Sequence, residues 1–166
     1  MIFLTIGTLE PFDRLVRMVD ELAETGCLPA EVFAQIGSSS YHPRHFRWVS
    51  ILEKEEFDRI FEESDFVISH AGMGSILTAV SRRKPMIVVP RLHCYGEHVN
   101  DHQLDTARQF EKMGMVLAAS SPEELRDKIQ AVVSFRPRWP QSTRENLVNR
   151  IRCYLGTVQK RKAERS

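Results

Sequence analysis

Two short stretches of the sequence carry residue types that suit ligand recognition. The first is SHAGMGS, residues 69–75, in which two glycines and a serine follow the apolar run 66–68. Residues 76–83 can continue as a helix, so the glycines lie between an expected strand and an expected helix. The first amides of a helix lack intrahelical partners and carry a partial positive charge. Such a helix start suits a phosphate group.

Glycines at this place have a second explanation. Gly72 and Gly74 remove side chains that would hold a ligand off the backbone, and Ser75 adds a hydroxyl donor to a helix beginning at Gly74 or Ser75. A tight strand-to-helix turn also needs glycines for its backbone angles, so both explanations stay open. His70 either faces the ligand or is a hydrogen-bonded structural histidine. The stretch lacks the GKS or GKT of a P-loop, and the first strand ends in GTLEP rather than GxGxxG.

The second stretch is HCYGEHVNDHQ, residues 93–103, which is rich in hydrogen-bonding side chains. His98 and His102 are four residues apart and could bind one metal on a helix, although Val99 stands where an HExxH motif needs glutamate. A solvated helix start explains part of the polarity. We favour a third interpretation, in which these groups face sugar hydroxyls. Phosphate at one helix start and hydroxyls at the next predict a nucleoside-diphosphate sugar.

An alternation of strands and helices must position these two stretches. We expect strands at 2–6, 31–36, 46–52, 66–69, 86–90 and 115–119, and helices at 12–23, 54–64, 74–83, 98–112 and 121–135. Ser121 is the expected N-cap of the last helix, followed by Pro122 and Glu124. The order predicts an α/β fold, a Rossmann-like parallel sheet with helices on both faces. Loops 7–8, 37–39, 70–75 and 91–98 should then open on one cleft at the carboxyl ends of the strands.

Composition bounds the remaining choices. The chain has 166 residues, 42% of them hydrophobic, and a net charge of +1, which is ordinary for one globular domain and gives no general attraction to nucleic acid. Three scattered cysteines form neither a zinc knuckle nor a disulfide framework and fit a reducing cytoplasm. The apolar start is too short for a signal peptide, and no run is long enough to span a bilayer. We expect a cytoplasmic protein that reaches a membrane only through a partner.

The sequence changes character after residue 135. RPRWP, residues 136–140, interrupts the pattern, and residues 141–155 then have the periodicity of a helix with one apolar side. Packing against its own domain and contact with a partner are both open for this helix. We expect a domain at 1–135, a C-terminal helical segment at 136–157 as a candidate partner contact, and a charged, disordered tail at 158–166.

Three longer stretches resemble the C-terminal, donor-binding half of the GT-B glycosyltransferases of family 28. They are FVISHAGMGSIL, KPMIVVPR and GEHVNDHQLDTARQF, and the resemblance extends from residue 1 to about residue 133. That family includes the transferase that adds N-acetylglucosamine to the peptidoglycan lipid precursor. The resemblance is strongest to its split members, which are the small subunit of the eukaryotic UDP-GlcNAc transferase acting on dolichol-linked oligosaccharide and the small subunits of bacterial capsule and exopolysaccharide clusters.

The resemblance implies a role for each residue of the two stretches. Met73, Gly74 and Ser75 would meet the phosphates, while Gly7 and Thr8 would line the cleft near the diphosphate. His102 and Gln103 match the pair that reads the donor sugar hydroxyls. The other residues that would contact or border the donor are His70, Gly72, Thr78, Glu97, His98, Asn100 and Asp101.

Two positions depart from the family pattern. Thr78 stands where many members carry a glutamate that holds the ribose hydroxyls, and Arg83 replaces the glycine that usually ends the same helix. A non-glycine residue at position 83 costs backbone strain if the left-handed conformation persists. Arg91, beside the cleft, would favour a donor sugar with a carboxylate.

The resemblance also implies what the chain would lack. A complete GT-B enzyme has two such domains, and the N-terminal half binds the acceptor. We therefore expect the donor-binding, catalytic subunit of a two-component UDP-sugar transferase, active with a membrane-anchored partner that binds a lipid-linked saccharide. GT-B enzymes generally need no metal ion, so we expect no metal and no cofactor. The alternatives are a non-catalytic nucleotide-sugar-binding regulatory subunit and a metal-dependent hydrolase or epimerase.

Overall fold

A six-stranded parallel sheet forms the centre of the molecule. The structure is a computed structural model that describes residues 1–138. The strands are β1 (Ile2–Thr5), β2 (Val32–Gln35), β3 (Arg47–Val49), β4 (Phe66–His70), β5 (Met86–Val89) and β6 (Leu117–Ala118), in the spatial order β3-β2-β1-β4-β5-β6. All neighbours are parallel. The predicted Rossmann-like α/β fold is confirmed.

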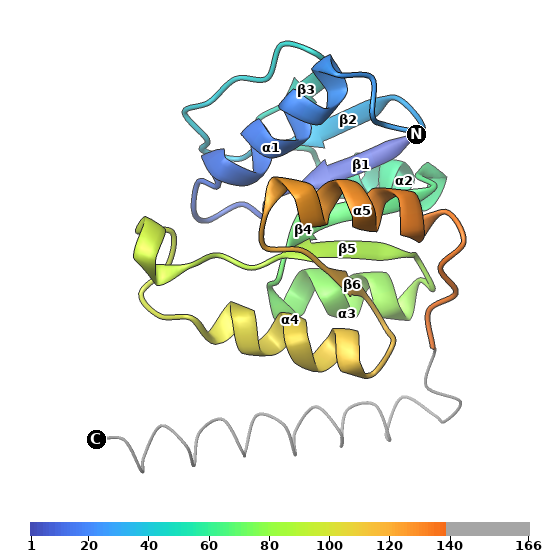
Figure 1. Cartoon of the computed structure of the whole chain (residues 1–166). Helices are drawn as coiled ribbons and strands as arrows, with labels where there is room; N and C mark the ends of the chain where they lie inside the picture. Colours follow the sequence, from blue (N-terminus) through green and yellow to red (C-terminus); the bar gives the residue numbers. More distant parts are fainter. Residues whose placement is uncertain (139–166) are drawn as a thin grey trace.

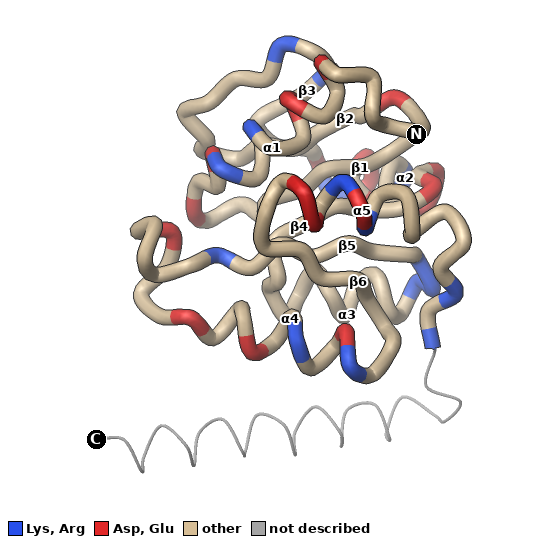
Figure 2. Tube along the Cα trace, in the orientation of Figure 1, with Lys and Arg blue, Asp and Glu red and all other residues tan. Residues whose placement is uncertain are grey.

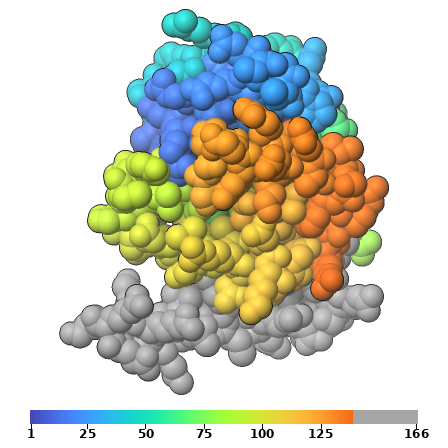
Figure 3. All heavy atoms as spheres, viewed as in Figure 1, coloured from blue at the N-terminus to red at the C-terminus, as the bar shows by residue number. Residues whose placement is uncertain are grey.

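Helices cover both faces of the sheet (Figure 1). The helices are α1 (Asp13–Glu24), α2 (Lys54–Glu63), α3 (Met73–Ser81), α4 (His102–Lys112) and α5 (Pro122–Val132). In the space-filling view the orange segment of α5 lies against the blue segment of α1 (Figure 3). These two helices share one face, and α2, α3 and α4 share the other.

The side-chain alternation of β1 explains why two separate cores form. Ile2 and Leu4 point to the face of α1 and α5, whereas Phe3 points to the opposite face, where it packs edge-on against Phe57 and Phe61 of α2. A central parallel strand is covered on both faces, so each of its residues must be compatible with burial. All four residues of β1 are in fact buried.

Several element boundaries differ from prediction: the strand expected at 46–52 spans Arg47–Val49, and the helix expected to reach residue 135 ends at Val132. The helix expected at 98–112 begins at His102, because residues 93–95 form a 3₁₀ turn and Gly96 adopts φ 68°. The helix expected from residue 74 begins at Met73. Arg83 has φ 53°, so the left-handed conformation persists without glycine and the condition set for backbone strain at this position is met. The helical segment predicted at 141–155 and the tail at 158–166 lie outside the described residues.

Candidate functional site

Loops from three strands meet where the strands end. A Cβ atom added to Gly37, after β2, would lie 3.0 Å from the carbonyl oxygen of Gly7, after β1. A Cβ atom added to Gly7 would lie 3.0 Å from Cε1 of His70, the last residue of β4. The glycines therefore allow these segments to pack closely. The predicted convergence of loops at the carboxyl edge is present in the structure.

The His70 ring lies between two glycines. A Cβ atom at Gly72 would lie 2.2 Å from Nε2 of His70, so Gly72 leaves room for the ring as much as for a ligand. The hydroxyl of Ser69 is 3.2 Å from Nδ1. Burial and, to a smaller extent, the charge of Arg91 together lower the pKa of His70 to about 4. His70 is consequently neutral near pH 7 and supplies no positive charge for a phosphate.

The start of α3 has unsatisfied amides. Its N-cap, Gly72, is extended and provides no side-chain cap, and the first amide with a carbonyl partner is that of Ile76, which donates to Gly72 at 3.1 Å. The amides of residues 73–75 have no acceptor among residues 1–138. A Cβ atom on Gly74 would meet nothing within 4 Å. An anion can therefore approach the amides closely, as the glycine loop predicted.

Thr78, the departure on the same helix, is already hydrogen-bonded. Its hydroxyl donates to the carbonyl oxygen of Gly74 at 2.9 Å, one turn earlier. The hydroxyl can still accept a hydrogen bond. A neutral hydroxyl in this position gives a weaker anchor for ribose than a carboxylate would, because it carries no charge.

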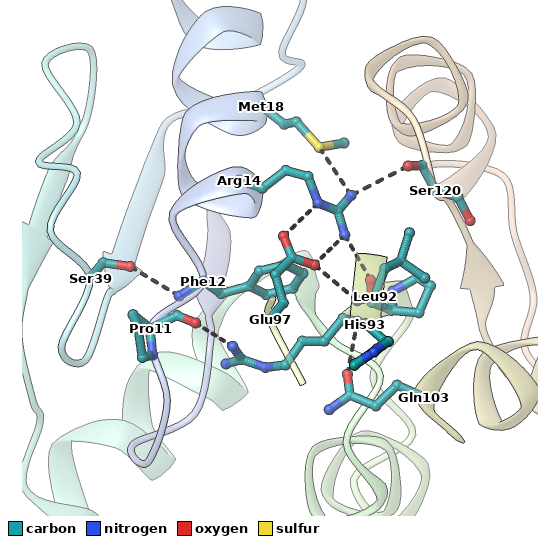
Figure 4. Close-up of polar contacts among 12 residues, drawn as sticks. Pro11, Phe12, Arg14, Met18, Ser39, Leu92, His93, Glu97, Gln103 and Ser120 are labelled. Carbon is teal, nitrogen blue, oxygen red and sulfur yellow. Dashed lines mark hydrogen bonds and ion pairs between the residues drawn. The ribbon is translucent and has the colours of Figure 1, made fainter. Parts of the chain in front are cut away.

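The segment between β5 and α4 is held against the start of α1 (Figure 4). Arg14 on α1 donates to both carboxylate oxygens of Glu97, at 2.7 Å and 2.9 Å. The Oε2 atom of Glu97 also accepts the amide of Leu92 at 3.0 Å. Glu97 was predicted to border the donor sugar. Because both of its oxygens are engaged, the structure gives it a role in fixing the loop.

Other polar residues of 93–103 bond to one another. The amide of His93 donates to Oδ1 of Asp101 at 2.8 Å, and the amide of His102 donates to Oδ1 of Asn100 at 3.1 Å. The rings of His98 and His102 lie edge to face, with centroids 4.4 Å apart. Asn100 and Asp101 therefore shape the turn that leads into α4. Within residues 1–138, no group of three or more His, Cys, Asp and Glu side chains could hold a metal ion.

Gln103 is buried, with 5% of its surface exposed, and its Oε1 accepts the backbone amide of Arg91 at 3.1 Å. The Arg91 guanidinium is buried as well, and it donates to the carbonyl oxygens of Ile6, at 2.9 Å, and Glu10, at 2.8 Å. A third bond goes to the carbonyl oxygen of Pro11. The idea that Arg91 reads a sugar carboxylate is wrong, because its guanidinium is buried and donates to three backbone carbonyls.

Sequence reasoning missed Arg14 and misjudged Arg91. Both are cationic residues that bind segments about 80 positions away. The one local signal was an arginine that directly follows the apolar run of β5 and Pro90. Of the other predicted residues, Thr8 is exposed, and Met73 packs against the core of α2, α3 and α4. Ser75 is partly exposed in the first turn of α3.

A separate hollow of about 780 Å³ lies between α1 and segment 40–48, and it contains neither predicted stretch. Asp20, at its wall, accepts the Tyr41 hydroxyl at 2.7 Å and the amide of His45 at 2.9 Å. These bonds fix the segment that crosses from β2 to β3. The lining carries both signs of charge, from Arg17 and Arg44 as well as Glu21, Glu24 and Asp20. We therefore leave it outside the candidate donor site.

A Rossmann-like parallel sheet with an uncapped helix start at its carboxyl edge defines an α/β protein suited to an anionic ligand. Within that class the chain belongs to a glycosyltransferase family. The model of the glycosyltransferase family 28 C-terminal domain matches residues 1–154, which includes most of the segment predicted as a C-terminal helix.

Curated relatives carry one name. The UDP-N-acetylglucosamine transferase subunit ALG13 of Homo sapiens is 33% identical over 122 residues, which cover 68% of this chain and 10% of the human protein. The subunit of the same name from Cryptococcus neoformans is 37% identical over 91 residues, 54% of this chain and 42% of the relative. The chain thus aligns with less than half the length of either relative.

Solved structures share the fold. An NMR solution structure of ALG13 has a TM-score of 0.60 at 21% identity, and the alignment covers 90% of this chain and 93% of that one. The crystal structure of MurG from Acinetobacter baumannii has a TM-score of 0.56 at 18% identity and covers 91% of this chain and 49% of that one. At these identities the likeness establishes the fold.

Proposed function

We propose that this chain is the donor-binding, catalytic subunit of a two-component UDP-sugar glycosyltransferase. The observation that carries the proposal is the uncapped start of α3, where the amides of residues 73–75 and open space at Gly74 face the carboxyl edge of the sheet. Family membership and relatives named as UDP-N-acetylglucosamine transferase subunits support it. UDP-N-acetylglucosamine is accordingly the first donor to test.

The site's chemistry follows from its electrostatics. Displacement at the anomeric carbon releases UDP, so negative charge grows on the diphosphate oxygens. The amides at the start of α3 and the Ser75 hydroxyl can donate to these oxygens and need no reorganisation during the reaction. Neutral His70 adds no charge, and the Arg91 guanidinium is occupied by carbonyls. The helix start is therefore the proposed source of leaving-group stabilisation, with no metal or other cofactor.

Turnover in this proposal needs a second protein. The chain supplies the donor half, and a membrane-anchored subunit binds a lipid-linked saccharide and recruits the chain to the cytoplasmic face of the membrane. Among residues 1–138 no helix has the length and apolar character to cross a bilayer. We place the reaction in capsule or exopolysaccharide assembly. Acidic and basic residues are interspersed along the described chain, without a continuous basic stripe for nucleic acid (Figure 2).

One observation favours a second candidate. The Thr78 hydroxyl is bonded within its helix, so the ribose has a weaker anchor, which suits a subunit that senses a nucleotide sugar without catalysis. The two functions differ in one measurement. Adding the membrane-anchored partner restores sugar transfer if the chain is catalytic and leaves it at zero if the chain only regulates.

Calorimetric titration of the full chain with UDP and UDP-N-acetylglucosamine, with and without EDTA, tests the donor site. We expect metal-independent binding, loss of that binding in Gly74→Val, and weaker binding in Gln103→Ala. Ala131→Val is the matched control, because it adds side-chain carbons at an exposed position in the last turn of α5. Absence of binding by the folded chain, alone and with its partner, would refute the proposal. UDP-glucose, UDP-galactose and UDP-glucuronic acid complete the donor panel.

A further inference from the structure

Arg91 is a buried cation without an ion pair among the described residues. Only 2% of its surface is exposed. Its guanidinium donates to three backbone carbonyls, those of Ile6, Glu10 and Pro11, and it lies 4.6 Å from the centre of the Phe12 ring. Burial of a charge is unfavourable unless hydrogen bonds satisfy it. These carbonyls meet that requirement, and they belong to one loop.

The carbonyls that Arg91 binds lie on both sides of Gly7 and Thr8. Ile6 precedes the pair, and Glu10 and Pro11 follow it. The guanidinium therefore gathers the β1–α1 loop around itself and fixes the path of its backbone. A planar group with five donors can serve several carbonyls at once, which a lysine ammonium cannot do with the same geometry.

The backbone of Arg91 makes a second connection. Its amide donates to Oε1 of Gln103, in the first turn of α4, at 3.1 Å. Dashed lines in Figure 4 mark this bond at the side chain of Gln103 and the side-chain bond at Pro11. One residue thus joins the loop of Gly7 and Thr8 to the helix start of His102 and Gln103. The side chain fixes the first element and the main chain fixes the second.

We propose that Arg91 is a positioning residue that sets the spacing between the β1–α1 loop and the first turn of α4, so that both contact one UDP-sugar. This inference rests on the proposed donor site. Arg91 touches no ligand in this scheme and acts through Gly7, Thr8 and Gln103. An arginine with a purely structural role would stabilise the fold. Mutations in the β1–α1 loop and in the first turn of α4 would then affect donor affinity independently of each other.

A double-mutant cycle separates these two roles. Arg91→Lys keeps the charge but removes the planar guanidinium with its several donors. We expect it to weaken UDP-N-acetylglucosamine binding about tenfold. Arg91→Lys combined with Gln103→Ala should weaken binding clearly less than the product of the two single effects, since residues in one network are not additive. A combined effect equal to that product would overturn the proposal.

Arg82→Lys is the matched control. Arg82 also uses several donors, to Asp58 and Glu62, but it lies at the far end of α3. We expect it to leave donor affinity within about twofold, and to be additive with Gln103→Ala. Donor affinity lowered equally by Arg82→Lys and Arg91→Lys would show that general destabilisation, rather than positioning, explains the loss.

Amide hydrogen exchange of the free chain gives a readout that does not depend on the ligand. Arg91→Lys should speed exchange at residues 6–11 and 99–103 while leaving α2 and α5 unchanged. Gln103→Ala, a milder variant, should speed exchange at residues 6–11 as well. Faster exchange throughout the chain, or confined to the element that carries the mutation, would overturn the inference. If the wild type binds no UDP-sugar, the proposed function fails, and exchange still decides whether Arg91 links the two elements.

Discussion

The starts of α3 and α5 differ in how they treat the first amides of the helix, which have no acceptor within the helix. At α5, the Ser121 hydroxyl accepts the amide of Glu124 at 3.2 Å, and a carboxylate oxygen of Glu124 accepts the amide of Ser120 at 2.7 Å. Proline occupies the first helical position, where no amide hydrogen is needed. The helix thus satisfies its own first turn and complements its own dipole.

At α3 no such arrangement exists. Its N-cap is Gly72, its first turn contains no acidic residue, and no side chain caps it. A nine-residue helix without a cap gives up stabilisation that the chain supplies at α5. Helices α1, α2 and α4 also lack a side-chain cap, but each has an acidic residue in its first turn. Among the five described α-helices, α3 alone has neither a cap nor a nearby carboxylate, which suits the proposed anionic ligand. Four tests examine this contrast.

The largest effect is expected for Gly72→Ala. The new Cβ atom would lie 2.2 Å from Nε2 of His70, so the ring or the start of α3 must shift. We expect roughly 3 kcal/mol lower free energy of unfolding, at the upper end of overpacking effects. We also expect UDP binding to be lost. Urea unfolding and calorimetry measure the two.

Gly74→Ala is the control for that substitution, because position 74 has open space. It should raise the free energy of unfolding by about 0.5–1 kcal/mol, the usual helix propensity difference. Equal destabilisation by the two substitutions would show that the His70 ring does not restrict the start of α3.

The second effect is a pH dependence from His70. Its pKa is about 4 in the folded chain and 6.5 ordinarily, so between these values the unfolded chain binds a proton that the folded chain does not. The free energy of unfolding should therefore fall as the pH drops from about 6.5 to about 4, by up to about 3 kcal/mol. Urea unfolding across this range measures it.

His70→Gln should remove this contribution, so that its stability falls less steeply than that of the wild type over the same pH range. His42→Gln, at an exposed position, should keep the wild-type slope. Identical slopes for all three proteins would mean that protonation of His70 is not linked to folding.

The third test uses a substitution that should raise the free energy of unfolding and weaken UDP binding at the same time. Gly74→Asp places a carboxylate in the first turn of α3, as Glu124 does in α5. The helix dipole should raise the free energy of unfolding by about 0.3–1 kcal/mol. Repulsion of the diphosphate should weaken UDP binding by about tenfold or more. Urea unfolding and calorimetry should thus change in opposite directions.

Gly74→Asn separates charge from size in that experiment, because asparagine has nearly the shape of aspartate without its charge. It should lose clearly less UDP affinity than Gly74→Asp. Undiminished UDP affinity in Gly74→Asp would place the diphosphate elsewhere.

The smallest effect concerns the capped helix. Ser121→Ala removes the hydroxyl that accepts the amide of Glu124, and we expect about 1 kcal/mol lower free energy of unfolding. Donor affinity should not change. Ser121→Asp, which keeps an accepting oxygen, should restore most of the stability. A loss of UDP affinity in Ser121→Ala would show that the start of α5, and not only the start of α3, affects donor binding.

The sequence was sufficient wherever local rules decide the structure. The alternation of strands and helices predicted the parallel sheet, although not the order of its strands. The start of α5 was predicted to the residue from Ser121, Pro122 and Glu124. The start of α3 was displaced by one residue, since a glycine N-cap gives no side-chain signal.

Distant contacts set the limit of prediction. The helix expected at residue 98 begins at residue 102, because Glu97 is tied to Arg14 and Asp101 binds the amide of His93. The partners of Arg91 lie 80 to 85 positions away in the sequence. No periodicity or short motif indicates which distant carbonyls a side chain binds. Arg91, which holds the backbone of another loop, was therefore interpreted as a ligand-binding residue.

The central place of β1 has a consequence for how the chain is made. Ile2 pairs with Val32 on one side and with Phe66 on the other, so β1 needs partners from two segments that are synthesised after it. Until β4 is synthesised, β1 has one unpaired apolar edge, which is a template for pairing with other chains. Early aggregation during translation, rather than weakness of the finished fold, is therefore the hazard that this topology imposes on expression.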